Sequence, residues 1–295
     1  MSLIQRIYVA GYKHDIMYAR SCVASIRKWY TDIPITLIKD ESYGPYSTSD
    51  IENYFNADVL QCDIKQFGWG FSKLEALYIE KKEKFLIVDA DTVLMGPVLD
   101  LLNDYKEDFV VPAIKTTTDF QENQYFDPTT IEKWDDTFKH TGYGFNTGQW
   151  VGTSGIFKRS DLTSFVNYKS SPISLYEEGL FKCGEQGFLN YFLFKHQQLH
   201  NISLAIVPFM EIGNNHKVDA IQSIDDVQTK DSLIIHWAGI RTQNIEHAAN
   251  GWILKKYIDY YYDALPFGKL RYFYDNAFKI FIGNLKVCFK KLIKS

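Results

Sequence analysis

Short apolar runs alternate with amphipathic helical patterns along the first third of the chain. Ile7–Ala10 and Ile35–Ile38 are predicted strands, and Phe85–Val88 is an unbroken apolar run, which is typical of a parallel strand covered on both faces. Apolar residues recur at three- and four-residue steps over Ile16–Trp29, and this spacing predicts an amphipathic helix. Ser72–Lys81 is a second predicted helix. This alternation predicts a doubly wound α/β sheet with helices on both faces.

The segment Ala113–Tyr143 breaks the alternation. It is polar and aromatic, and it predicts a long surface excursion with a short helix around Thr130–Lys139. Loops of this length are frequently lids or binding loops. Strands are predicted to resume near Gly155–Phe157, Leu204–Val207 and Ser232–Ile235.

Composition narrows the class of protein. The 295 residues are 46% apolar and 23% charged, which suits one large globular domain, with or without an appendage. No cysteine pair has the spacing of a zinc site, so we expect reduced thiols. No signal-peptide pattern and no uncharged apolar stretch long enough to span a membrane is visible. We therefore expect a cytoplasmic protein.

The charge is unevenly distributed. Residues 266–295 contain seven basic residues and one acid, although the whole chain has a net charge of −4. The acidic remainder argues against nucleic acid as the main partner. We therefore predict a body, residues 1–265, and a basic amphipathic tail, residues 266–295, which needs an anionic partner of its own.

The tail has the pattern of a helix that lies in the headgroup layer of a membrane. Pro266 can open a helix, and basic side chains are predicted to fall opposite an apolar face formed by Leu270, Phe273, Tyr274, Ala277, Phe281, Leu285, Cys288 and Leu292. The alternative is a helix packed on the acidic body. We expect peripheral contact with the inner face of a membrane.

Two carboxylates, Asp89 and Asp91, follow the apolar run Phe85–Val88. Ligands of open α/β sheets bind at the carboxyl ends of the strands. Two acids at such a place repel one another unless a cation joins them, and Mn²⁺ or Mg²⁺ accepts carboxylate oxygens and bridges to diphosphates. The alternative interpretation is a helix cap followed by a solvated acid.

A second candidate is His236, which follows the apolar run Leu233–Ile235 and could reach the same metal. A histidine in this position is otherwise structural. Two further motifs are Gly184–Asn190, in which Glu185 and Gln186 open a helix, and Gly144–Gly148, which contains Asn146. Alone, each is explained by a favourable charge in a first helical turn or by an Asn-Gly turn.

Together, and in this order, these segments resemble the family 8 glycosyltransferases, which include glycogenin and bacterial lipo-oligosaccharide galactosyltransferases. The resemblance extends from Ile7 to about Thr242. The matching segments are Phe71–Leu74, Val88–Thr92, Phe145–Gly148, Gly184–Asn190 and Ile235–Gly239.

The resemblance implies a GT-A fold, which is an α/β fold with a mixed, mostly parallel sheet and helices on both faces. It also implies a metal-dependent glycosyltransferase that uses a nucleotide-sugar, with uridine as the base, and a glycan or lipid-linked acceptor. It implies retention of the anomeric configuration. The implied metal ligands for Mn²⁺ or Mg²⁺ are Asp89, Asp91 and His236. The implied catalytic residues are Asn146, Glu185 and Gln186. The implied substrate-binding residues are Lys73, Tyr8, Ala10, Tyr12, Asp40, Gly239 and Arg241.

Two positions depart from the family pattern. The family has Asp where Glu185 stands, and it has a phosphate-gripping Lys where Thr242 stands, so Arg241 is the candidate to replace that Lys. Two other functions remain open. A nucleotidyltransferase of related fold normally has a Gly-rich basic loop after the first strand, where this chain has one glycine between Ala10 and His14. A non-catalytic sugar-binding protein would not need the three metal ligands.

Overall fold

The structure is a computed structural model that describes residues 3–68, 70–112, 114–115, 122–225, 227, 231–239 and 245–275. Within these residues the main sheet has seven strands, in the spatial order β12 (Leu204–Val207), β6 (Phe109–Pro112), β9 (Gln149–Thr153), β4 (Lys84–Asp89), β1 (Arg6–Tyr12), β2 (Ile35–Asp40) and β3 (Ala57–Val59). Only β9 runs antiparallel to its neighbours, β4 and β6. The predicted mixed, mostly parallel sheet is confirmed.

A smaller sheet lies beside the main one and carries part of the site. Its order is β13 (Met210–Ile212), β14 (Leu233–His236) and β5 (Thr92–Met95). Two short ribbons complete the described strands: β7 (Ile114–Lys115) pairs with β8 (Tyr143–Gly144), and β10 (Val166–Asn167) pairs with β11 (Ser174–Leu175).

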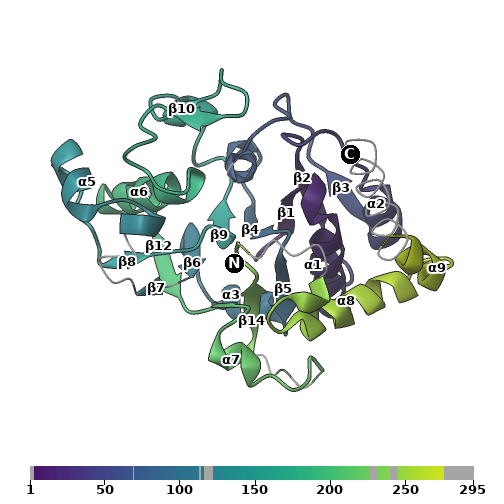
Figure 1. Ribbon diagram of the computed structural model, residues 1–295. Helices are drawn as coiled ribbons and strands as arrows, with labels where there is room; N and C mark the ends of the chain where they lie inside the picture. The colour runs from purple at the N-terminus through teal and green to yellow at the C-terminus, as the bar shows by residue number, and fades with distance from the viewer. Residues whose placement is uncertain are drawn as a thin grey trace, which may run out of the picture.

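Helices cover both faces of the main sheet (Figure 1). On one face lie α1 (Ile16–Trp29), α2 (Ser49–Phe55) and α8 (Gly251–Asp263), and on the other lie the 3₁₀ helix η2 (Phe71–Tyr78) and α6 (Glu185–Gln198). The shorter helices are η1 (Lys13–Asp15), α3 (Val98–Leu102), α5 (Pro128–Trp134), η3 (Arg159–Leu162), α7 (His216–Asp219), η5 (Ile245–His247) and α9 (Gly268–Phe273).

Alternation along the central strands divides the core into two layers. On β4, Leu86 and Val88 pack into the layer under α1 and α8, whereas Phe85 and Ile87 pack into the layer under η2 and α6. Successive side chains of a strand point to opposite faces, so the unbroken apolar run is needed to fill both layers. The cost of leaving polar groups in either layer explains why the acids occur only where β4 ends.

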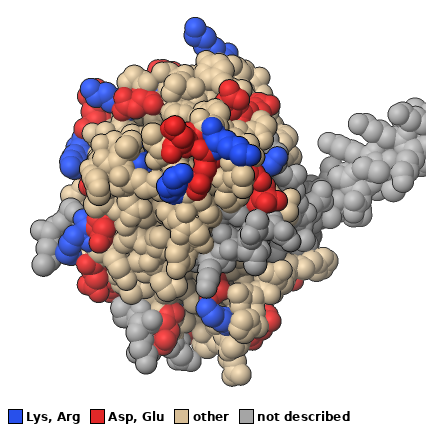
Figure 2. Space-filling model, turned by 90° about the vertical axis from the view of Figure 1, so that its left-hand side faces the viewer, with Lys and Arg blue, Asp and Glu red and all other residues tan. Residues whose placement is uncertain are grey.

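The outer face of α5 and α6, at the left of Figure 1, carries charges of both signs (Figure 2). Lys195 of α6 lies 2.7 Å from Asp135 at the end of α5, and Lys139 lies 3.5 Å from Glu132. The hydrogen bonds from Lys195 and Tyr191 hold the pKa of Asp135 far below its usual range, although burial alone would raise it. Lys195 and Tyr191 thus fasten the end of α5 to α6, which begins at the site.

Two local predictions need correction. Residues Gly155–Phe157 are not a strand; the strand is β9, which ends at Thr153. Gly155 turns the chain with a φ of +71°. Position 157 requires an apolar residue because the ring of Phe157 packs on the ring of Phe192. The segment predicted as a helix to Lys81 forms the 3₁₀ helix η2, which ends at Tyr78.

The described part of the chain contains no helix that is both long and apolar enough to cross a bilayer.

Candidate active site

The end of β4 is fixed between two neighbouring strands. The amide of Asp89 donates to the carbonyl of Gly148 at 2.6 Å, just before β9, and the amide of Ala90 donates to the carbonyl of Ala10 on β1 at 2.8 Å. The turn that follows leads directly into β5 and carries Asp91. Both carboxylates are therefore held on fixed backbone at the carboxyl end of the sheet.

A third side chain reaches these acids through strand pairing. β14 pairs antiparallel with β5 so that His236 lies opposite Thr92, and the amide of Trp237 donates to the carbonyl of Asp91 at 2.9 Å. Nε2 of His236 lies 3.1 Å from Oδ1 of Asp91 and 4.0 Å from Oδ2 of Asp89. The three side chains, which the sequence places in two distant segments, form one cluster.

This cluster fits a divalent cation. One ligand atom from each of Asp89, Asp91 and His236 can be chosen so that all lie within 4.8 Å of one another. Two carboxylate oxygens and an imidazole nitrogen form a donor set that Mn²⁺ accepts, and Mg²⁺ takes carboxylates together with phosphates. Nδ1 of His236 is buried and has no hydrogen-bond partner among the described residues.

The cluster is electrostatically coupled. Burial alone would lower the pKa of His236, but Asp91 and Asp89 outweigh it and raise that pKa. Burial would likewise raise the pKa of Asp91, but His236 outweighs it and lowers that pKa. Asp91 is thus kept ionised, which is the state that binds a cation, whereas His236 can bind one only after it loses its proton.

Lys73 brings a buried positive charge to the edge of the cluster. Its side chain, on η2, is only 3% exposed, and Nζ lies 3.2 Å from Oδ1 of Asp89 and 3.4 Å from Oε2 of Glu185. Nζ also donates to the carbonyl of Thr147 at 2.9 Å. Burial would lower the pKa of Lys73, but the carboxylates of Asp89 and Glu185 outweigh it and raise that pKa.

Glu185, the first residue of α6, has one oxygen bound and one free. Its Oε2 accepts from the hydroxyl of Thr147 at 3.0 Å, whereas the buried Oε1 has no partner among the described residues. Burial, opposed by Lys73, raises the pKa of Glu185 to about 7. Gly70 approaches closely, since a Cβ there would lie 2.7 Å from Oε2. The side chain can therefore offer an acceptor, or a donor when protonated, to a polar ligand.

The other two predicted catalytic residues are Asn146 and Gln186. Asn146 directly precedes Thr147, and Gln186 directly follows Glu185 in α6. Oδ1 of Asn146 accepts from the amide of Gly148 at 2.7 Å and forms a tight turn, and Nε2 of Gln186 donates to the carbonyl of Gln124 at 3.3 Å. Asn190 joins these segments, because its amide donates to and accepts from the backbone of Phe145, both at 2.8 Å.

Comparisons with known proteins bear on the fold. No protein-family model matches the chain, and no curated protein matches it by sequence. Among solved structures, the bifunctional glycosyltransferase WbbM matches 88% of the chain with a TM-score of 0.53 and 12% identity, and the chain spans 50% of WbbM. The galactosyltransferase LgtC, solved with donor and acceptor sugar analogues, matches 87% of the chain with a TM-score of 0.52 and 13% identity, and 95% of LgtC is covered. GlyE from Streptococcus pneumoniae TIGR4 matches 86% with a TM-score of 0.50 and 17% identity, with 60% of GlyE covered.

This chain has the GT-A glycosyltransferase fold. The cluster of Asp89, Asp91 and His236 lies at the carboxyl ends of strands in this fold, where open α/β sheets bind their ligands. At these identities the likeness establishes the fold alone, so the activity has to be inferred from the site.

The predicted base-contacting residues of this GT-A chain lie at different depths. Tyr8 is buried in the core, and its hydroxyl donates to Glu83 at 3.0 Å, so its side chain does not join the cluster. Ala10 pairs in register with Asp89. Tyr12 lies at the end of β1, with its ring 5.3 Å from the exposed ring of Tyr43.

Asp40, at the end of β2, has structural contacts. Its carboxylate accepts from the amides of Ser42, Phe67 and Gly68 at 2.9 to 3.1 Å. It therefore joins the loop after β2 to the loop before η2.

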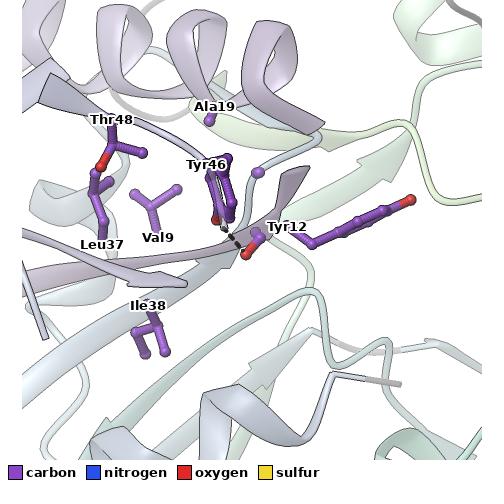
Figure 3. Close-up of a pocket in the computed structure, with 9 residues that line it drawn as sticks. Val9, Tyr12, Ala19, Leu37, Ile38, Tyr46 and Thr48 are labelled. Atoms are coloured by element: carbon purple, nitrogen blue, oxygen red, sulfur yellow. Dashed lines mark hydrogen bonds between the residues drawn. The ribbon is translucent and has the colours of Figure 1, made fainter. Parts of the chain in front are cut away.

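A small cavity of about 10 Å³ lies behind Tyr12, between β1, β2 and α1. Figure 3 shows the ring of Tyr46 next to Ala19, with its hydroxyl hydrogen-bonded to the carbonyl of Gly11 at 2.7 Å, whereas the side chain of Tyr12 points away. Such a volume holds no more than about one water molecule. A nucleotide base therefore does not fit there in the present conformation, and Tyr12 offers its ring on the outer side.

At the other end of the site, Gly239 has a φ of +74° and open space where a Cβ would stand. Arg241, the candidate phosphate ligand, lies outside the described residues.

Three residues that position the site were not identified as functional from the sequence. Gly148 gives His236 its space, Thr147 binds both Lys73 and Glu185, and Asn190 holds Phe145. All lie inside the motifs already quoted. Their partners are more than thirty residues away in each case and cannot be seen in a local pattern.

Proposed function

We propose that this chain is a metal-dependent glycosyltransferase of the family 8 type, which moves a hexose from a nucleotide-sugar, with UDP as the carrier, to a hydroxyl group. The observation that carries the proposal is the meeting of Asp89, Asp91 and His236 within 4.8 Å, with Lys73 beside them, at the strand ends of a GT-A fold. A nucleoside diphosphate is the ligand class that needs both a cation and a buried ammonium.

The chemistry follows from the leaving group. Asp89, Asp91 and His236 would hold a divalent cation, which would supply charge stabilisation to a departing diphosphate. Lys73 adds a fixed positive charge on the same side, and Arg241 is our candidate for a further phosphate contact. Tyr12, Ala10 and Asp40 are proposed to lie along the nucleoside, and Gly239 close to the phosphates.

We propose that transfer retains the anomeric configuration. The bond from the anomeric carbon to the diphosphate breaks, with its electron pair leaving on the phosphate oxygen, and the acceptor oxygen forms the new bond on the same face while its proton passes to that phosphate oxygen. Asn146 and Gln186 would line the reacting face, and the free Oε1 of Glu185 would bind a sugar hydroxyl. An α-linked donor should give an α-linked product by proton NMR, and a β-linked product would refute retention.

The acceptor is proposed to be a glycan or a lipid-linked sugar at a membrane surface. Support comes from the described start of the tail, where Phe267, Leu270 and Phe273 are 81%, 68% and 58% exposed, near the basic Lys269 and Arg271. Exposed aromatic and aliphatic side chains among basic residues suit an anionic lipid surface. Nucleic acid is not part of the proposal.

A donor-hydrolysis assay tests the proposed function. The full chain, incubated with a panel of nucleotide-sugars and MnCl₂, should release free sugar and nucleoside diphosphate, and EDTA should stop the release. Asp91→Asn should abolish the manganese-dependent release, whereas exchange of the exposed Asp136 for Asn should leave it unchanged.

Two outcomes favour the other functions. Release of pyrophosphate from a nucleoside triphosphate and a sugar phosphate would indicate a nucleotidyltransferase. Donor binding without hydrolysis or transfer, with or without manganese, would indicate a non-catalytic sugar-binding protein.

A further inference from the structure

Asp89, one of the two carboxylates of the proposed metal site, already pairs with the ammonium group of Lys73. Nζ of Lys73 lies 3.2 Å from Oδ1 of Asp89 and 3.4 Å from Oδ2, so both oxygens of this ligand face the ammonium. Asp91, in contrast, faces His236 at 3.1 Å. The two acids of the Asp-x-Asp motif are therefore not equivalent, because among the described residues only Asp89 forms an ion pair with a lysine.

Lys73 has little freedom to withdraw. Its side chain is 3% exposed, Nζ donates to the carbonyl of Thr147 at 2.9 Å, and Glu185 lies 3.4 Å away on the other side. Gly70 packs close to the ammonium, since a Cβ there would lie 3.2 Å from Nζ. An ammonium held in this way stays within a few ångströms of any cation that Asp89 binds.

We propose that Lys73 is a built-in competitor of the divalent cation for Asp89, which makes tight cation binding depend on the diphosphate. This inference rests on the proposed function. The ammonium and the divalent ion repel one another, and the repulsion is strong where burial excludes water. A diphosphate placed against both cations neutralises them together, so each of the two ligands strengthens the binding of the other. Such coupling is reciprocal by thermodynamic necessity.

The coupling has a functional consequence. A site that binds the metal tightly on its own would also hold it when no donor is present. With Lys73 in place, the metal and the nucleotide bind and leave together. When no donor is bound, Lys73 holds the side chains of Asp89 and Glu185 in position. If Lys73 acted only as a donor ligand, the affinity for the metal alone would not depend on it.

Calorimetric titration of MnCl₂ into the full chain, without nucleotide, tests the proposal. Lys73→Met should bind Mn²⁺ about tenfold more tightly than the natural chain, because a repelling charge is removed. The control is Lys84→Met, which removes a lysine that is 2% exposed at the amino end of β4, the strand that ends at Asp89. This control should leave the affinity unchanged. Equal or weaker Mn²⁺ binding by Lys73→Met, or no Mn²⁺ binding by either chain, would overturn the proposal.

A second variant guards against misfolding. Lys73→Met leaves two carboxylates without their counter-ion, so Lys73→Met/Glu185→Gln removes one of these charges, and Glu185→Gln alone is its reference. The double variant should also bind Mn²⁺ about tenfold more tightly than its reference. Saturating UDP should strengthen Mn²⁺ binding in the natural chain, and this gain should shrink by about tenfold when Lys73 is replaced.

The proposed function and this inference can fail separately. A chain that hydrolyses donors while Lys73→Met leaves Mn²⁺ affinity unchanged keeps the function and loses the competition. A chain that shows the tenfold change without any hydrolysis or transfer keeps the competition and loses the function.

Discussion

Gly148 lies so close to the imidazole of His236 that a Cβ atom at residue 148 would stand 2.2 Å from Cε1 and 2.7 Å from Nδ1. The position of His236, the proposed metal ligand, thus depends on a residue without a side chain. Oδ1 of Asn146 would also lie only 2.9 Å from that Cβ, so the turn that holds Asn146 and the ring of His236 meet at the same place.

Gly148→Ala should therefore displace His236 and weaken Mn²⁺ binding by about 10- to 100-fold, the range found when partners that orient a metal ligand are removed. Calorimetry with MnCl₂ measures the loss. Gly179→Ala is the matched control, because a Cβ at residue 179 meets nothing within 4 Å. If Gly148→Ala binds Mn²⁺ like this control, His236 is not a ligand or its ring can move freely.

The raised pKa of Glu185 gives a prediction for the pH dependence of stability. Burial is the main cause, and although Lys73 opposes it, the pKa rises from 4.5 to about 7. Between pH 4.5 and pH 7 the folded chain therefore binds more protons than the unfolded chain. The free energy of unfolding should then fall as the pH rises from 4.5 to 7 on account of this residue. Its contribution to the slope is at most about 1.4 kcal/mol per pH unit.

Glu185→Gln should remove that part of the slope, measured by urea unfolding at a series of pH values. Glu178→Gln, at an exposed glutamate, should keep the slope of the natural chain. Parallel curves for the natural chain and Glu185→Gln would mean that Glu185 is ionised through this window in the folded state.

Strand β4 was predictable because its signal is local. The apolar run Phe85–Val88 lies within β4, and it alone indicates that an acid directly after it lies at the edge of the sheet. The apolar run Leu233–Ile235 likewise indicates that His236 follows a strand and could reach the same metal, and the resemblance to a family supports this. That His236 lies opposite Thr92, next to Asp91, depends on the pairing of β14 with β5, for which a local pattern gives no signal.

β9 shows why some of the fold could not be predicted. It contains Gln149 and Gly152 among its five buried residues, so its mean hydropathy is low for a covered strand. Gly152 is needed there because a Cβ would meet the rings of Trp150 and Phe85 at 2.6 and 2.9 Å. Such packing constraints come from distant residues, and a local pattern places the strand a few residues too late.

Arg20 should be important for stability, because it joins four parts of the chain. Its guanidinium lies 2.8 Å from Asp50 and 2.9 Å from Asp275 and donates to the hydroxyl of Tyr262 at 2.8 Å, while Arg20 itself is 8% exposed. Arg20→Met leaves two carboxylates without their partner and should lower the free energy of unfolding by about 3–5 kcal/mol.

Denaturant unfolding measures the effect, and Lys217→Met is the control. Lys217 pairs with Glu211 at the surface, where the lysine is 63% exposed, so its removal should change stability by less than about 1 kcal/mol. A change of that small size for Arg20→Met would mean that α9 and the residues after it are held to the body by other contacts. Since Asp275 belongs to this network, a chain shortened at residue 265 would also lose a partner of Arg20.

The proposed membrane contact of the tail is therefore better tested by substitution than by truncation. Phe267, Leu270 and Phe273 are all more than half exposed, and three exchanges to Ser leave the pair of Arg20 and Asp275 in place. In sedimentation with vesicles that contain anionic lipid, the triple variant should partition at least about tenfold less than the natural chain, because three apolar side chains no longer enter the bilayer.

The control for this experiment exchanges Tyr176 and Leu199 for Ser, two side chains that are 57% and 50% exposed elsewhere on the body. This variant should sediment like the natural chain. Raising the salt concentration should weaken the vesicle binding of the natural chain and of the control, because salt screens the attraction between the basic residues of the tail and the anionic lipid. If the triple variant and the control partition equally at low salt, α9 does not enter the bilayer, and a membrane-linked acceptor loses its support from the described residues.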